Sequence, residues 1–171
     1  MVAVAGWTAG AVAAHAAVPF WLARVPGPTR TTPALRSTGV VAIAAGGALM
    51  TWAFAAHYQA APQGWDVTSR PAPEYLLRAG PYLLCRNPMY LGEAIVWLGW
   101  SLFYGRPAVW AGSATLYAGL PVVVRWEERG LIDSFGDDYR TYLAQVPRWL
   151  PTRLIWVLAR RSRPACASRA G

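Results

Sequence analysis

The chain has 171 residues, of which 55% are hydrophobic and only 14% are charged, and its net charge is +8. A soluble domain normally has about a quarter of its residues charged, and a disordered chain needs low hydrophobicity, so neither class fits. A free nucleic-acid-binding module is also excluded, because the arginines lie among long apolar runs rather than in a solvated patch. The two cysteines, Cys85 and Cys166, lie far apart without metal-like spacing, which indicates neither a disulfide framework nor a metal site. The remaining class is membrane-embedded.

Four apolar runs predict an all-α fold, an integral membrane helical bundle. The first run contains His15 as its only ionisable residue and lacks the basic start of a signal peptide. The third is interrupted by one carboxylate, Glu93, and a Gly105-Arg106-Pro107 turn joins it to the fourth. The last two runs form a helical hairpin near the short end of what crosses a bilayer, which takes about 20 residues. The expected spans are 2–22, 39–58, 89–104 and 108–124.

The distribution of arginine predicts the orientation of this bundle. If both termini are inside, twelve of the sixteen arginines fall on the inner side and only Arg24, Arg30, Arg36 and Arg106 fall outside. That distribution satisfies the positive-inside rule, and the opposite orientation violates it. We therefore expect an integral protein of a bacterial cytoplasmic membrane, with both termini cytoplasmic. It would form a single domain over residues 1–161, including a short cytoplasmic C-terminal helical cap, and a disordered tail over 162–171.

The first segment that could carry chemistry is 80–93, Gly-Pro-Tyr-Leu-Leu-Cys-Arg-Asn-Pro-Met-Tyr-Leu-Gly-Glu. Pro88 suits the first turn of a helix and Asn87 suits its N-cap. The segment is therefore also explained as a helix start at the membrane interface, where Tyr82 and Tyr90 would serve as anchors.

Glu93 is less easily explained by structure alone. It lies one turn inside an apolar helix, where a carboxylate is costly and usually faces a polar cavity or a partner. A functional role is therefore the default interpretation. The alternative is a structural ion pair with Arg86 or Arg78.

The second candidate is Arg125-Trp126-Glu127-Glu128-Arg129, directly after the fourth run. Two adjacent carboxylates at a helix C-terminal end oppose the macrodipole, so something cationic should offset them. Local pairing with Arg125 and Arg129 would be sufficient. The functional alternative is that one glutamate binds the ammonium group of a ligand.

The third candidate runs from Phe135 to Tyr142 and continues into Pro147-Arg148-Trp149-Leu150-Pro151. Gly136 should break the preceding helix, and the acidic pair after it is placed to start a short new one. Tyr139 and Tyr142 would share a face of that helix.

Together these blocks resemble the superfamily of isoprenylcysteine carboxyl methyltransferases and phospholipid methyltransferases. Members typically show Gly-x-Tyr, Arg-His-Pro-x-Tyr-x-Gly, a Glu-Glu pair, Phe-Gly-x-x-Tyr-x-x-Tyr and Pro-Arg-x-x-Pro. The matches here begin at Gly80, Arg86, Glu127, Phe135 and Pro147, in the same order. Five short motifs in the right order and spacing are a fairly specific signal over residues 74–151.

The resemblance implies an integral-membrane enzyme that uses S-adenosylmethionine, bound at the cytoplasmic end of the last two helices. Glu127 would meet the methionine ammonium, and aromatic faces suit a sulfonium through cation–π attraction. The resemblance assigns the cofactor to Glu74, Tyr75, Leu76, Leu77, Tyr82, Asn87, Pro88, Met89, Tyr90, Glu127 and Glu128.

The acceptor would be a lipophilic small molecule or a membrane lipid, either an isoprenylcysteine-like carboxylate or a phospholipid-like amine. Methyl transfer relies mainly on positioning, but an amine acceptor needs a base, for which Glu93 is the candidate. Arg125 is the nearest candidate to orient a carboxylate, since Val123 stands where eukaryotic members have a substrate-binding arginine, and Arg86 is the third candidate catalytic residue. Asn87 replaces the usual histidine, so only a hydrogen-bonding role survives there.

Two other interpretations fit part of the sequence. Membrane sterol and steroid reductases, which use NADPH, have similar C-terminal halves, although this chain is short for that group. A small non-enzymatic membrane subunit would explain the ten tryptophans, which lie mostly in or beside the spans. Binding of S-adenosylhomocysteine, of NADPH or of neither would separate the three.

Overall fold

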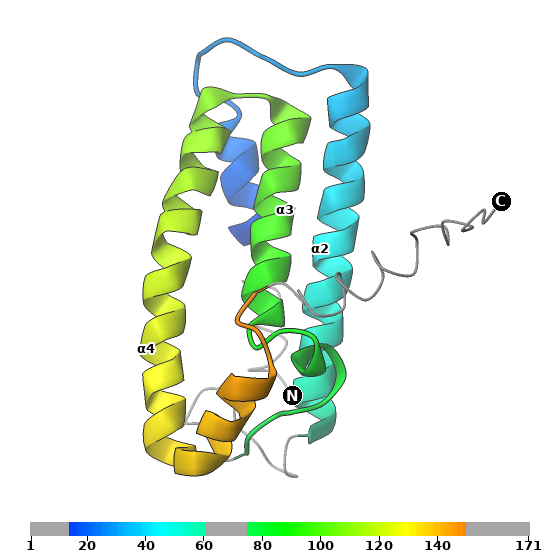
Figure 1. The fold of residues 1–171 in the computed structure, drawn as a ribbon. Coiled ribbons are helices and arrows are strands. Elements are labelled where there is room, and N and C mark those ends of the chain that lie inside the picture. Colours follow the sequence, from blue (N-terminus) through cyan, green and yellow to red (C-terminus); the bar gives the residue numbers. More distant parts are fainter. Residues whose placement is uncertain (1–13, 61–74, 150–171) are drawn as a thin grey trace, which may run out of the picture.

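The computed structural model describes residues 14–60 and 75–149. Within these ranges every regular element is a helix. A first helix covers residues 14–22 and is followed by α2 (Pro33–Ala60), a 3₁₀ turn η1 (Gly80–Leu83), α3 (Pro88–Tyr104) and α4 (Pro107–Gln145). Figure 1 shows α2, α3 and α4 running lengthwise beside one another. The predicted all-helical fold is confirmed for this part of the chain, whereas most of the first expected span and the expected tail lie outside it.

Helices α2 and α3 approach closely because glycines face each other across their interface. A Cβ atom added at Gly46 would lie 2.5 Å from the carbonyl oxygen of Gly92, and one added at Gly39 would lie 2.6 Å from that of Gly99. Both helices therefore repeat a glycine every seven residues on the contact face. Small residues at such an interface are the usual packing solution in membranes, where backbones must approach for van der Waals contact.

The α3–α4 hairpin forms at the predicted turn. Gly105 ends α3 in the left-handed region with φ of 59°, which glycine adopts without steric cost, and Pro107 begins α4. Two buried serines join the helices: the Ser101 and Ser113 hydroxyls lie 2.7 Å apart, and Ser113 donates to the carbonyl of Trp97 at 3.1 Å. Buried hydroxyls in an apolar bundle are thus satisfied within the protein.

Helix α4 continues well past its apolar part and then reverses. The break lies at Gly136, whose φ of 53° and ψ of −124° are not helical, as the sequence predicted. In Figure 1 the final part of α4 turns back at the lower end and lies beside the chain leading into α3. The Glu127-Glu128 pair consequently lies inside a helix. The expectation that it sits at a helix C-terminal end was wrong, because residues 129–135 continue the hydrogen-bonded turns.

Two of the described helices, α2 and α4, are long and apolar enough to cross a membrane. Their apolar side chains largely face outward, as Val40, Val41 and Val122 are exposed, which suits contact with lipid more than a soluble core. The four-span topology stays a prediction: the first expected span is described only from residue 14, and α3 has 17 residues.

Candidate functional site

A cavity of about 980 Å³ lies toward the end of the bundle at which α4 reverses. We call it the main cavity. Its walls come from every described element and from the segment that precedes η1. The lining residues are His15, Met50, His57, Tyr75, Leu76, Leu77, Tyr82, Arg86, Asn87, Met89, Tyr90, Glu93, Trp126, Glu127, Arg129, Gly130, Leu131, Asp133, Ser134, Tyr139 and Tyr142.

The structure brings most of the residues predicted to bind a cofactor together in this cavity. Pro88 at the start of α3 and Glu128 in α4 are both buried, and neither lines the cavity. Glu74 lies outside the described residues. Those that line the cavity are Tyr75, Leu76, Leu77, Tyr82, Asn87, Met89, Tyr90 and Glu127.

Tyr90 and Glu127 join α3 to α4 at the cavity wall. The Tyr90 hydroxyl donates to Glu127 Oε1 at 2.5 Å. A hydrogen bond to an ionised carboxylate is short and strong, and it fixes the carboxylate orientation. Glu127 is half-buried and faces the cavity, so its second oxygen can accept from a ligand.

Glu128, the neighbour of Glu127, is held by two arginines that are distant in sequence. Arg86 Nε and Nη2 lie 3.1 and 3.0 Å from Glu128 Oε1, and Arg148 Nη2 lies 2.6 Å from Oε2. The side chains of Glu128 and Arg86 are 7% and 10% exposed. The expected local pairing with the flanking Arg125 and Arg129 was wrong. Helix α4 turns the Glu128 side chain toward residues 137–149, the folded-back segment that follows the break at Gly136.

The same cluster attaches the reversed end of α4 to the start of α3. The Arg86 side chain donates to the carbonyls of Leu143 and Val146 at 2.9 and 2.8 Å, and its backbone N–H donates to that of Pro147. The Asn87 amide donates to the carbonyl of Arg148 at 3.2 Å. Asn87 occupies the predicted N-cap position, but its side chain makes this tertiary bond in place of a capping bond.

Glu93 lies deeper in the bundle, and its partner is His15. Glu93 Oε1 is 3.0 Å from His15 Nε2, and both side chains are about one-fifth exposed. The expected alternative, a pair with Arg86 or Arg78, was wrong: Arg86 binds Glu128, and Arg78 binds Asp138 at 3.4 Å. Glu93 thus places a titratable pair at the cavity wall.

Tyrosines from the folded-back segment close the cavity. Tyr139 and Tyr142 are 2% and 4% exposed, and the Tyr142 hydroxyl donates to the carbonyl of Tyr82 at 2.6 Å. Burial raises the pKa of the Tyr82 phenol above its usual range, so this group stays neutral. Burial also raises the pKa of the Cys85 thiol, which makes a nucleophilic thiolate unfavourable there.

Arg125 is exposed and does not line the cavity, whereas Arg129 does. The α4 lining residues between Glu127 and the break at Gly136 were not predicted from the sequence. Their spacing was the available signal, because Glu127, Gly130, Leu131 and Ser134 follow the i, i+3, i+4, i+7 pattern of one helix face. His15, Met50 and His57 gave no such signal.

Comparisons with known proteins agree with the motifs. The chain is 33% identical to methanethiol S-methyltransferase 1 of Bradyrhizobium diazoefficiens over 72 residues. This aligned stretch covers 42% of this chain and 25% of that protein. It is 40% identical to phosphatidyl-N-methylethanolamine N-methyltransferase of Saccharomyces cerevisiae over 48 residues, and this stretch covers 28% of this chain and 23% of the yeast protein. Over 77 residues it is 34% identical to the cobalt-zinc-cadmium resistance protein CzcN of Cupriavidus metallidurans, 44% and 35% of the two chains.

The matched region therefore spans about a quarter to a third of the length of these relatives. No solved structure matches the chain. The family model of phospholipid methyltransferases matches residues 35–138, which is more than half of the chain and includes α2, α3 and the carboxylates of α4. With the resemblance found in the motifs thereby confirmed, the chain belongs to the phospholipid methyltransferase family.

Proposed function

We propose that the protein transfers a methyl group from S-adenosylmethionine to a lipophilic acceptor, with both bound in the main cavity. The observation that carries this proposal is the Glu127 carboxylate, oriented by Tyr90 and facing a cavity with aromatic walls. A carboxylate in a partly dry site binds an ammonium group well, and aromatic faces attract a sulfonium.

The residues of the cavity fit such a ligand in size and in chemistry. Its volume of about 980 Å³ is at the upper end of the range of small-molecule sites. The apolar Leu76, Leu77 and Met89 lie beside the aromatic Tyr75 and Tyr82. Bound S-adenosylmethionine supplies an electrophilic methyl group on a positively charged sulfur, and the protein contributes mainly by positioning.

The His15–Glu93 pair supports an acceptor that must lose a proton. An amine has to be neutral before its lone pair can attack, and Glu93 with His15 can accept the proton within the cavity. The yeast relative is named for an amine-containing phospholipid, and the Bradyrhizobium relative for a thiol. Because the family model that matches is that of phospholipid methyltransferases, we propose a phospholipid-like amine as the acceptor and Glu93 as its base.

Ligand-induced thermal stabilisation of the detergent-solubilised protein tests the cofactor. S-Adenosylhomocysteine should raise the Tm of the wild type and leave that of Glu127→Gln unchanged. Asp137→Asn is the matched control, because Asp137 is also an α4 carboxylate but is almost fully exposed and outside the cavity. Stabilisation by NADPH alone would instead support a reductase, and stabilisation by neither ligand a non-enzymatic subunit.

Transfer of radiolabelled methyl groups into extracted membrane lipids and prenylated small molecules tests the acceptor. Label in an amine-containing lipid is expected, with a large loss of kcat in Glu93→Gln. Full turnover by a folded Glu93→Gln protein would remove Glu93 as the base. Label in a prenylated carboxylate would replace the amine acceptor.

A further inference from the structure

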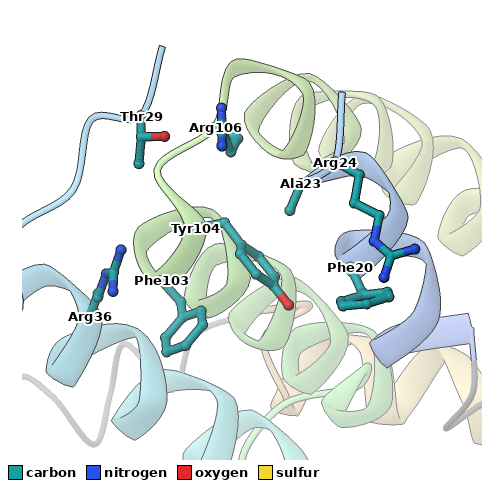
Figure 2. A pocket seen from close by; sticks show the side chains of 8 residues that line it. All are labelled: Phe20, Ala23, Arg24, Thr29, Arg36, Phe103, Tyr104 and Arg106. Carbon is teal, nitrogen blue, oxygen red and sulfur yellow. The ribbon is translucent and has the colours of Figure 1, made fainter. Parts of the chain in front are cut away.

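A second pocket lies at the opposite end of the bundle, where α3 joins α4. Its volume is about 360 Å³. Figure 2 shows three arginines around it that come from separate segments: Arg24 after the first helix, Arg36 in α2, and Arg106 in the α3–α4 turn. Tyr104 lies between them in this view, and Phe20 and Thr29 also contribute to the lining. We call this site the arginine pocket.

The arginine pocket has no carboxylate to neutralise it. The sequence contains no Asp or Glu from residue 1 to 65 or from 94 to 126, and among the described residues these stretches include every residue that lines the arginine pocket. Helices α2 and α4 both begin here without an acidic residue in the first turn, so their dipoles add positive potential. An anion is the natural ligand for three guanidinium groups in this setting.

Contacts within the protein hold two of the guanidinium groups in place. The Arg24 guanidinium carbon lies 4.1 Å above the Phe20 ring and 4.6 Å above the Trp21 ring. Arg106 Nη1 donates to the carbonyl of Gly27 at 2.5 Å. Each guanidinium has five N–H donors, so both keep donors available for an anion. Partial preorganisation lowers the entropy lost on binding.

Exposed aromatic side chains place the pocket at the level of lipid headgroups. Trp21, Phe20 and Trp110 are 62%, 43% and 42% exposed at this same end. Tryptophan is enriched where the apolar membrane core meets the headgroup region, because its ring is amphipathic. A lipid headgroup at this level lies within reach of the arginine pocket.

We propose that the arginine pocket binds the phosphate of an anionic phospholipid headgroup in the leaflet farther from the main cavity. This site is separate from the proposed methyl-transfer site, and its occupant would be a bound lipid rather than the substrate. Each guanidinium that contacts the phosphate directly contributes up to about fivefold to the affinity, as a well-placed exposed ion pair does, and an arginine outside the pocket makes no such contact. Loss of two pocket arginines should therefore weaken binding by up to about 30-fold.

Native mass spectrometry of the full-length protein with short-chain phosphatidylglycerol measures this affinity. The Arg24→Gln/Arg36→Gln variant should bind up to about 30-fold more weakly than the wild type. Arg30→Gln is the matched control, because Arg30 belongs to the same loop but does not line the pocket, and it should bind like the wild type. Phosphatidylcholine, in which a cation offsets the phosphate, should bind more weakly than phosphatidylglycerol.

Three outcomes would overturn the proposal. The first is equal binding of phosphatidylglycerol by the wild type and the double variant. The second is a loss in Arg30→Gln as large as that in Arg24→Gln measured as a single variant, which would indicate diffuse attraction without a site. The third is binding of inorganic phosphate as tight as that of the lipid and equally dependent on Arg24 and Arg36, which would assign the pocket to a soluble anion. A thermal melt of each variant without lipid controls for misfolding.

Discussion

Adjacent carboxylates in α4 should have opposite roles, with Glu128 stabilising the fold and Glu127 binding the ligand. Replacing Glu128 by Gln keeps the side-chain shape but leaves two guanidinium groups without their counter-charge. Removing one partner of a buried ion pair costs about 3–5 kcal/mol. Because the Arg148 side chain is 34% exposed and can recover hydration, we expect the lower end, about 3 kcal/mol.

A free energy of this size is easily measured. For a chain of this length about 1 kcal/mol shifts Tm by 2–4 °C, so Glu128→Gln should lower Tm by about 6–12 °C. Glu127→Gln should leave Tm nearly unchanged, since the half-buried side chain faces the cavity and the amide oxygen of Gln can still accept the hydrogen bond from Tyr90. Thermal unfolding in one detergent, with and without S-adenosylhomocysteine, measures both properties.

Each variant should change one of the two properties, its Tm or the shift of Tm with ligand, and keep the other. Glu128→Gln should have a lowered Tm that S-adenosylhomocysteine still raises. Glu127→Gln should have a Tm close to that of the wild type, and S-adenosylhomocysteine should not change it. Asp137→Asn, whose ion pair with Arg140 is solvated, should match the wild type in both measurements. If Glu128→Gln melted like the wild type, the argument from the two-arginine cluster would be refuted.

Three further pairs of substitutions test the α2–α3 packing, the break in α4 and the hydrogen bond of Asn87. Gly46→Ala should destabilise by about 1–3 kcal/mol, because its Cβ would lie 2.5 Å from a carbonyl oxygen of α3, whereas Gly47→Ala, with open space around it, should not, as thermal unfolding would show. Gly136→Ala should cost about 1–3 kcal/mol in the same assay, because its φ of 53° with ψ of −124° is a conformation that alanine rarely adopts, while Gly130→Ala in the regular part of α4 should be neutral or stabilising. Asn87→Asp should cost about 1–3 kcal/mol, because the donor to the Arg148 carbonyl is lost, and Asn87→His should cost less, which denaturant titration can rank.

The local features of the fold were predictable because they depend on neighbouring residues. The turn at Gly105, the start of α3 at Pro88 and the break at Gly136 follow from the backbone preferences of glycine and proline. The lining residues Tyr75, Leu76, Leu77 and Tyr90 could be found from the family resemblance. These positions were identified through resemblance, since nothing in their composition or periodicity points to a ligand.

The ion partners could not be predicted, because they depend on tertiary contacts. Glu128 is paired with Arg86 and Arg148, which are 42 and 20 residues away. The partner of Glu93 is His15, which comes from the first helix. A sequence offers several arginines of equal plausibility near Glu128, and the reversal at Gly136 brings Arg148 to it.

That reversal also explains why an asparagine can occupy the position where related sequences usually have histidine. Residues 84–87 and 146–149 are irregular, and backbone without regular hydrogen bonds is tolerated near a membrane only where protein or water satisfies it. Here the two segments satisfy each other: the Arg86 N–H donates to the Pro147 carbonyl and the Asn87 amide to that of Arg148. A neutral imidazole N–H provides the same kind of donor. The position therefore requires a hydrogen-bond donor, which asparagine and histidine both supply.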